Sequence, residues 1–285
     1  MRLSPRGNPP EETPGLMGGA VARALDMLFP AGCVSCRTWI PRSEARDGAP
    51  ICARCRSRLR MASWPRCARC HAPLGTGLAR LNNAETPDCH ECRPWSPQLS
   101  TARSAFLLAA PASDLVHALK YEGWSELAGF MAWRMAAVVR ESANRASADG
   151  VQPGGVWDAQ RVVVMPMPTT PTRERRRGYN QAGLLAAGVA SELGLPLKSL
   201  LIRTLDRRSQ IKLEPRERRA NVRGVFAPHP AMGGLSGTSV VLVDDVLTTG
   251  ATASEAAALL IEQGASSVHL ATFARALPEP FSSLS

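Results

Sequence analysis

The sequence lacks the two commonest phosphate-binding patterns of nucleotide-binding proteins. It has neither the lysine-ended glycine-rich loop of the P-loop proteins nor the GxGxxG spacing of dinucleotide sites. It also lacks an apolar run long enough to cross a bilayer, because residues 20–29 are interrupted by Arg23 and Asp26 and are better interpreted as one amphipathic helix. No secretory signal is apparent. We therefore expect a cytoplasmic protein without membrane insertion.

Composition divides the chain into three parts. Its 285 residues, 45% of them hydrophobic, are enough for one large or two modest globular domains. Residues 1–24 are dominated by Pro, Gly and charged residues, and we expect a disordered tail there. Residues 25–95 contain all the cysteines but too little apolar material for a core of their own. Residues 96–285 have the texture of an ordinary globular domain.

All eight cysteines fall into four Cys-x-x-Cys units. Between the first and second units lie 15 residues, between the third and fourth 18, and between the second and third only 11. Two such units supply the four thiolates of a tetrahedral zinc site, and the first two gaps suit zinc ribbons. We predict two structural Zn²⁺ sites with sequential pairing, although interleaved pairing stays open. The expected ligands are Cys33, Cys36, Cys52, Cys55, Cys67, Cys70, Cys89 and Cys92.

Two other interpretations of the cysteines fit less well. A disulfide framework belongs to exported proteins, and no export signal is seen. A thioredoxin-like redox pair would need one unit within a βαβ pattern, not four units in succession. His71 and His90 adjoin cysteines, but with eight thiols present we treat both as non-ligands.

Past residue 95, predicted strands alternate with predicted helices. This order predicts an α/β fold with a mostly parallel sheet and ligands at the carboxyl ends of the strands. Residues 142–158 are small, polar and Gly-rich, and we expect a loop there. The expected strands are 102–109, 161–166, 200–203, 240–243 and 268–273, and the expected helices are 114–120, 126–140, 180–193 and the segment ending near 263.

The most informative stretch is residues 240–252, with the sequence VVLVDDVLTTGAT. A buried strand ends in two acids, Asp244 and Asp245, and a hydroxyl-rich turn leads into a helix. The acids can accept hydrogen bonds from vicinal ribose hydroxyls, while the turn offers N–H groups and hydroxyls to a phosphate at a helix N-terminus. The residues expected around the phosphate are Thr248, Thr249, Gly250, Ala251 and Thr252.

Positive charge is concentrated in one part of the chain. The formal net charge is +10, which eight thiolates and two zinc ions would lower to +6. Residues 173–223 hold 13 Lys and Arg against 5 Asp and Glu. Such a concentration suggests an anionic partner, which could be a pyrophosphate, a nucleic acid or both, and a solvated basic surface is the alternative for the arginines outside the pocket.

The 240–252 stretch resembles the binding motif of type I phosphoribosyltransferases, which hold phosphoribosyl pyrophosphate. The whole chain from about 25 to 275 resembles the ComF/GntX family, in which a double zinc ribbon precedes such a domain. The segments that carry the resemblance are the four cysteine units, His117 with Lys120-Tyr121-x-Gly123, residues 162–168, 177–181 and 219–226, and the 240–252 motif itself.

The resemblance implies roles for two further loops. The loop after Pro168, with Arg173, would bind pyrophosphate, and a flexible hood near 205–220 would close on the ligand with Lys212, Arg216 and Arg219. Mg²⁺ would bridge the pyrophosphate and the ribose hydroxyls, with Asp244 and Asp245 as the catalytic residues. The sequence departs from the family at Thr169-Thr170, where Leu-His is expected, and at Arg176, where an acid is expected.

Two functions are compatible with these features. The first is a phosphoribosyltransferase of the ComF competence and DNA-uptake type, whose acceptor no segment of the sequence identifies. The alternative is a non-catalytic protein that binds single-stranded DNA in response to phosphoribosyl pyrophosphate. DNA-uptake or recombination proteins would then be partners.

Overall fold

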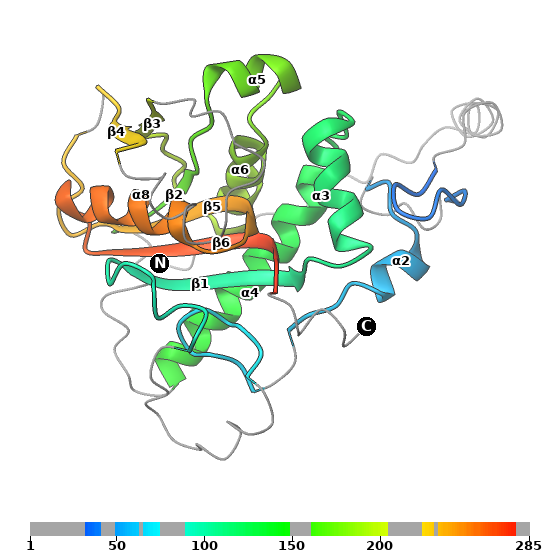
Figure 1. The fold of residues 1–285 in the computed structure, drawn as a ribbon, viewed down its shortest axis with the longest axis horizontal. Helices are drawn as coiled ribbons and strands as arrows, with labels where there is room; N and C mark the ends of the chain where they lie inside the picture. The colour runs from blue at the N-terminus through cyan, green and yellow to red at the C-terminus, as the bar shows by residue number, and fades with distance from the viewer. Residues whose placement is uncertain are drawn as a thin grey trace, which may run out of the picture.

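A parallel sheet forms the centre of the molecule (Figure 1). The computed structural model describes residues 32–40, 49–62, 65–74, 89–148, 161–204, 224–230 and 233–277. Four strands pair in the order β1-β6-β5-β2, all parallel, and β3 and β4 form a separate antiparallel pair. The strands are β1 Leu99–Leu107, β2 Val162–Pro166, β3 Leu201–Arg203, β4 Phe226–Pro228, β5 Ser239–Leu247 and β6 Ser267–Arg275.

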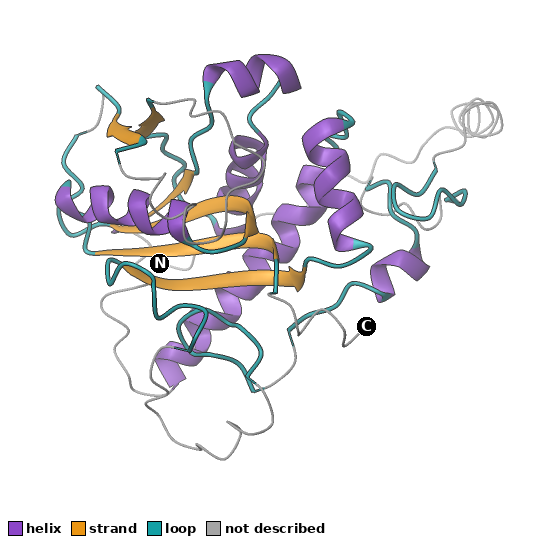
Figure 2. Cartoon of the chain, viewed as in Figure 1, coloured by secondary structure: helices purple, strands orange, loops and turns teal. Residues whose placement is uncertain are grey.

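Helices cover both faces of this sheet (Figure 2). α3, α4 and α6 pack on one face, and α8 packs on the other. The short helix α2 lies in the cysteine-rich part, and α5 follows β2. The helices are α2 Ala53–Ser57, α3 Ala112–Tyr121, α4 Leu127–Ala148, α5 Pro171–Arg177, α6 Gln181–Leu193 and α8 Ala251–Glu262.

Local sequence accounts for β2 and for α5, the helix that follows it. All five residues of β2 are buried, as expected of a parallel strand covered on both faces. Thr170 then caps α5 by accepting a hydrogen bond from the Arg173 N–H, and Pro171 occupies the first helical turn. Gly178 ends this helix at φ 82°, a left-handed conformation that favours glycine.

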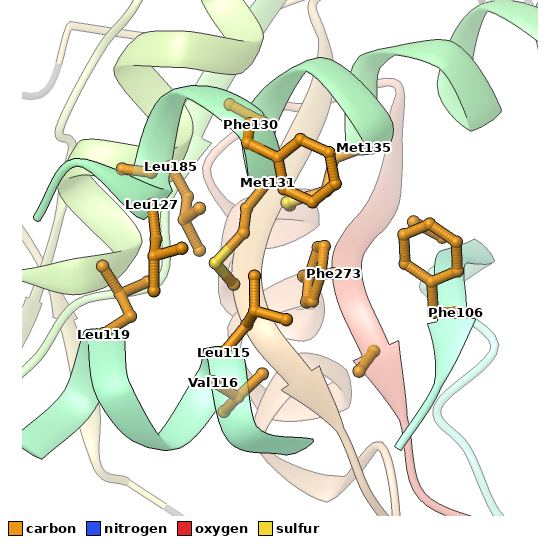
Figure 3. Packing of buried hydrophobic residues seen from close by; sticks show 14 of the residues in the cluster. Phe106, Leu115, Val116, Leu119, Leu127, Phe130, Met131, Met135, Leu185 and Phe273 are labelled. Atoms are coloured by element: carbon orange, nitrogen blue, oxygen red, sulfur yellow. The ribbon is translucent and has the colours of Figure 1, made fainter. Parts of the chain in front are cut away.

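The face under α3, α4 and α6 holds the larger aromatic and sulfur-containing side chains (Figure 3). Phe106 of β1 and Phe273 of β6 meet edge to face, with ring centroids 5.3 Å apart. Met131 and Met135 of α4 are fully buried above them. This core fixes α3 over the carboxyl end of the sheet.

The opposite face has a core of smaller side chains beneath α8. Val240 and Leu242 of β5 and Val268 of β6 pack against Ala256 and Leu260 of that helix. Alternate residues of β5 therefore serve different cores, as the two-residue period of a strand requires.

The cysteine-rich segments pack into both cores. Cys33, Cys52 and Cys55 belong to the core under α3 and α4, whereas Cys67, Cys70 and Cys92 belong to the core under α8. The second set of segments also covers the open edge of β1, where the Ala102 N–H donates to the Arg69 carbonyl at 2.9 Å. The edge strand is thereby protected from pairing with another chain.

The structure confirms the predicted fold class and refines several elements. Helix α4 continues to Ala148, so the first part of the loop predicted over 142–158 is helical; Ala143 and Arg145 are good helix formers and continue the helix into it. The loop predicted after Pro168 contains α5. The tail over 1–24 and the hood near 205–220 lie outside the described residues. Among the described helices, none combines the length and apolarity needed to span a membrane.

Candidate functional site

The eight cysteines gather into two clusters of four. Cys33, Cys36, Cys52 and Cys55 form the first cluster and Cys67, Cys70, Cys89 and Cys92 the second, with all sulfur atoms of a cluster within 4.8 Å of one another. All eight are free thiols rather than disulfides. The sequential pairing predicted from the spacing is confirmed.

The sulfur positions fit a zinc ion in each cluster. Four sulfurs at the usual Zn–S distance of about 2.3 Å form a tetrahedron with edges of about 3.8 Å. The Cys36–Cys52 and Cys67–Cys92 sulfur pairs are each 3.7 Å apart, as are Cys89 and Cys92. Since protein ligands fill all four positions, these are structural sites.

A cavity of about 970 Å³ opens at the carboxyl ends of β2 and β5. Such a volume is at the upper end of the range for small-molecule sites. Both signs of charge line it. The cations among its described residues are Lys120, Arg173, Arg176, Arg177 and Arg203, and the anions are Asp244 and Asp245.

The two acids of β5 point to opposite faces of the sheet. Asp245 follows Val241 and Val243 to the α3 face, and Asp244 follows Val240 and Leu242 to the α8 face, because side chains alternate along a strand. On the α3 face Lys120 meets Asp245, with Nζ 2.8 Å from Oδ1. The ion pair is almost buried, since the two side chains are 20% and 5% exposed.

The surroundings of Asp244, by contrast, disfavour the charged form of its carboxyl group. Burial, and then the neighbouring charge of Asp245, raise the pKa of Asp244 from 3.8 to about 7. The Asp245 N–H donates to Asp244 Oδ1 at 2.9 Å, and Lys120 and Arg203 oppose part of the shift in its pKa.

The turn after β5 is built around Gly250, which caps α8 at φ 75°. Gly250, the N-cap residue, has no side chain to cap this helix; Thr249 Oγ1 accepts from the Ala251 N–H at 3.4 Å, and the other N–H groups of the first turn keep the partial positive charge that favours an anion. Thr248 and Thr252, on either side of the glycine, line the cavity. Thr249, Gly250 and Ala251 form the backbone of the turn.

Several buried polar atoms at the cavity have no hydrogen-bond partner among the residues that the structure describes. They are Asp245 Oδ2, Asn180 Oδ1, Gln181 Oε1 and Arg177 Nε, and all four residues line the cavity. Buried polar atoms are rarely left unpaired in proteins. These atoms therefore mark the cavity as a place where a polar ligand would complete the hydrogen bonding.

The structure brings most of the sequence-predicted site residues together. Asp244, Asp245, Thr248, Thr252, Pro168 and Arg173 all line one cavity. Lys212, Arg216 and Arg219 lie outside the described residues. Lys120, Arg177, Asn180 and Gln181 received no role from the sequence, although the segments that carry the family resemblance contained them.

Comparisons with known proteins agree with this architecture. A family model described as "Phosphoribosyl transferase domain" matches residues 180–280, and one described as "Double zinc ribbon domain" matches residues 24–93. The second match includes all eight cysteines and therefore spans both clusters.

Three relatives match nearly the full length of the chain. DNA utilization protein YhgH of Salmonella typhimurium is 30% identical over 234 residues, which cover 80% of this chain and 97% of the relative. Competence protein F of Haemophilus influenzae is 25% identical, covering 87% of this chain and 99% of the relative. Competence protein ComFC of Bacillus subtilis is 24% identical, covering 87% and 92%. With a double zinc ribbon, a phosphoribosyltransferase-type domain and these relatives, the chain belongs to the ComF/GntX family of competence and DNA-utilization proteins.

Proposed function

We propose that the cavity at the carboxyl end of the sheet binds phosphoribosyl pyrophosphate together with Mg²⁺. The observation that carries the proposal is the meeting, at one cavity, of two strand-end carboxylates, a helix N-terminus that begins at a glycine and five cationic side chains. A sugar with phosphate groups at both ends needs acceptors in the middle and positive charge on either side.

The carboxylates would hold the ribose. Asp245 Oδ1 is paired with Lys120, which leaves the buried Oδ2 as an acceptor for a sugar hydroxyl. Asp244 lies next to it, facing the other side of the strand end. Two neighbouring carboxylates suit the vicinal hydroxyls of a ribose better than a phosphate, which their negative charge would repel.

The two phosphate ends would lie on either side of the carboxylates. The turn 248–252 offers N–H groups and the hydroxyls of Thr248 and Thr252 to the 5′-phosphate. Pro168 and Arg173, with Arg176 and Arg177 of α5, would face the pyrophosphate. Closure by Lys212, Arg216 and Arg219 of the hood stays a prediction from the family resemblance.

The residues present also fit Mg²⁺, which prefers oxygen ligands and keeps several waters. Asp244 and Asp245 supply carboxylate oxygens, one of them unpaired. When bound, the ion would neutralise charge on the pyrophosphate and favour its departure.

Whether a group is then transferred depends on an acceptor. A nucleophile would attack C1 of the ribose as the bond from C1 to the pyrophosphate oxygen breaks, and the two carboxylates would hold the ribose in place for that step. The charge of the departing pyrophosphate would be met by the cations of α5. Transfer of the phosphoribosyl group is thus within the chemical means of the site.

A second candidate function is binding of single-stranded DNA in response to phosphoribosyl pyrophosphate. Its support is the surface beside the cavity, where α5 exposes Arg175 and Arg176 and the Tyr121 ring is 58% exposed. The guanidinium of Arg177 lies 5.3 Å from the centre of that ring. Exposed cations beside an aromatic ring are what single-stranded nucleic acids bind.

A calorimetric ligand panel tests the first proposal. The folded, zinc-loaded chain is titrated with phosphoribosyl pyrophosphate, with and without Mg²⁺, and with ATP, whose ribose carries a triphosphate on C5′ and a base instead of pyrophosphate on C1′. We expect Mg²⁺-dependent binding of phosphoribosyl pyrophosphate and much weaker binding of ATP. Equal affinities for the two would reduce the cavity to a general anion site.

A pyrophosphate-release assay separates transfer from binding. A panel of bases and amines is offered with Mg²⁺ and phosphoribosyl pyrophosphate, with and without single-stranded DNA. Release with one acceptor favours the transferase, and donor binding without turnover favours the DNA-binding alternative.

Fluorescence anisotropy then tests the DNA surface. Arg175→Ala, on α5, should make the plot of log affinity for single-stranded DNA against log salt concentration less steep. The slope should change by roughly 0.7, the value expected for the loss of one phosphate contact. Arg161→Ala, at the start of β2 and away from the cavity, is the matched control and should leave the slope unchanged. Equal slopes for both variants would remove α5 from the DNA surface.

A further inference from the structure

The second zinc cluster is joined to the phosphate-binding turn by one side chain, Trp95. Its indole Nε1–H donates to the Thr249 carbonyl at 2.9 Å, across 154 positions of sequence. The ring also lies directly against Gly250, where an added Cβ would come within 2.4 Å of it. Trp95 is only 6% exposed, so water does not compete for this contact.

This hydrogen bond fixes the orientation of one peptide group in the turn. A trans peptide is planar, and its C=O and N–H point in opposite directions. Because Trp95 holds the Thr249 carbonyl, the Gly250 N–H is directed away from the indole. Glycine is required at position 250 for two reasons, its φ of 75° and the closeness of the ring.

We propose that Trp95 is a positioning residue for the 5′-phosphate site, through which the second zinc cluster controls the affinity for phosphoribosylated ligands. The inference rests on the proposed function, because it concerns the phosphate end of that same cavity. Without the indole, the peptide between Thr249 and Gly250 is free to turn, and its N–H is no longer preorganised for an anion.

The zinc cluster in turn fixes Trp95. The backbone N–H of Trp95 donates to the backbone carbonyl of the expected zinc ligand Cys92 at 3.0 Å. The Arg69 side chain, from within the third cysteine unit, donates to the Ser96 carbonyl at 2.7 Å and lies 5.9 Å from the centre of the indole.

A further hydrogen bond joins this segment to α8. The Ser96 N–H donates to Ser254 Oγ at 3.3 Å, one turn into the helix that begins at the phosphate site. The segment that carries Cys92, Trp95 and Ser96 therefore contacts both the turn and the helix. Order at the zinc site is transmitted to both parts of the phosphate site.

A purely structural role for Trp95 makes a different prediction. If the ring only fills space, its loss weakens every ligand of the cavity alike or lowers stability alone. If it orients the turn, the loss is confined to ligands that carry a phosphate at that turn. Inorganic pyrophosphate, expected at the α5 side, therefore serves as an internal reference.

The test compares Trp95→Phe with wild type in calorimetric titrations of ribose 5-phosphate, phosphoribosyl pyrophosphate and inorganic pyrophosphate. Phenylalanine keeps an aromatic ring but removes the N–H donor. We expect ribose 5-phosphate and phosphoribosyl pyrophosphate to bind about three- to tenfold more weakly, the equivalent of one hydrogen bond, and pyrophosphate to change less than about twofold. Trp133→Phe, on the 45%-exposed tryptophan of α4, is the matched control and should change none of the three.

Three results would overturn the inference. Unchanged ribose 5-phosphate binding in Trp95→Phe, or equal weakening of all three ligands, removes the positioning role while leaving the proposed function intact. Absence of ribose 5-phosphate and phosphoribosyl pyrophosphate binding in wild type removes the proposed function, and this inference falls with it.

A second measurement on the wild-type chain needs no variant. Coupling between the affinities of two sites is reciprocal, so saturating ribose 5-phosphate should raise the affinity for one of the two zinc ions, measured as the amount released at equilibrium with a chelator. Inorganic pyrophosphate should not. Identical release with either ligand would contradict the coupling, even if Trp95→Phe fails to fold.

Discussion

The two four-cysteine clusters share a ligand set and a spacing, but they are attached to the rest of the molecule differently. The first packs buried residues into the core under α3 and α4, but its polar contacts with α3 and the residue after it lie near the surface: Ser35 donates to Asp114 at 2.6 Å, and Arg37 lies 3.5 Å from Glu122. The Arg37 side chain is 66% exposed, and such ion pairs contribute little to stability.

The second cluster is held by buried arginines. Arg275 of β6, only 1% exposed, donates to the Cys70 carbonyl at 2.6 Å. Arg103 of β1 donates to the carbonyls of Ala68 and Arg69, each at 3.0 Å. A zinc ion with four thiolates carries a net charge of about −2, so these cations also compensate the charge of the site.

The two clusters contact different parts of the proposed site. The first lies against α3, whose Lys120 pairs with Asp245 at the proposed ribose position. The second reaches the turn 248–252 through Trp95, at the proposed phosphate end. We infer that the zinc ribbons serve as supports of the site, the second more directly than the first.

Removing one ligand from each cluster should produce the largest difference. Cys33→Ser and Cys70→Ser each replace a fully buried cysteine, and each should lower bound zinc from about two ions to one. Cys70→Ser should weaken phosphoribosyl pyrophosphate binding at least about tenfold, because it loosens the segment that carries Trp95, and Cys33→Ser less than about threefold. Elemental analysis and calorimetry on both variants check this.

Equal loss of phosphoribosyl pyrophosphate affinity in the two variants would contradict the difference proposed between the clusters. It would mean that both zinc sites act only through global stability.

Replacing the arginine at each attachment should have the next largest effect. Arg275→Met leaves the Cys70 carbonyl unpaired and the zinc site less compensated, and should lower the free energy of unfolding by about 2–4 kcal/mol. Arg37→Ala removes only a surface ion pair and should cost less than about 0.5 kcal/mol. Urea denaturation of both variants measures the difference. Similar midpoints would show that burial of Arg275 does not anchor the second cluster.

The smallest effect concerns the two acids on opposite faces of β5. The folded pKa of Asp244, about 7, lies above its ordinary value of 3.8, so between these values the folded chain keeps a proton that the unfolded chain releases. This group's contribution to stability is therefore lost as pH rises from about 4 to 7. When the pH is raised from 5.5 to 8, wild type should therefore lose about 1–2 kcal/mol of unfolding free energy relative to Asp244→Asn.

Urea denaturation at the two pH values checks the prediction, and Asp245→Asn is the control. That substitution deprives the nearly buried Lys120 of its partner and should lower stability at both pH values. A pH dependence of Asp244→Asn identical to that of wild type would contradict the raised pKa.

Much of this fold could be predicted because its signals are local. The Val-rich runs before Pro166 and Asp244 predicted β2 and β5, and the cysteine spacing predicted which four thiols meet. The 240–252 motif identified the strand-end acids from residue types alone. Each of these features depends on neighbours within about 20 positions of the sequence.

The contacts that complete the site could not be predicted in this way. Lys120 meets Asp245 only because the Phe106 and Phe273 core fixes α3 over the end of β5. The hydrogen bond from Trp95 to Thr249 depends on how the second cluster lies against the sheet. Such pairings arise from tertiary packing and leave no periodic pattern.

Titration calorimetry with Mg²⁺ and phosphoribosyl pyrophosphate tests the central claim most directly, with wild type compared with a chain carrying both Asp244→Asn and Asp245→Asn. Zinc content and circular dichroism first establish that the double variant is folded. Wild type should bind, and the double variant should lose at least about 100-fold in affinity, because both negative charges that attract Mg²⁺ and the ribose hydroxyls are gone and each amide keeps only one acceptor oxygen. Unchanged affinity in the folded double variant would contradict the assignment of this cavity to phosphoribosyl pyrophosphate.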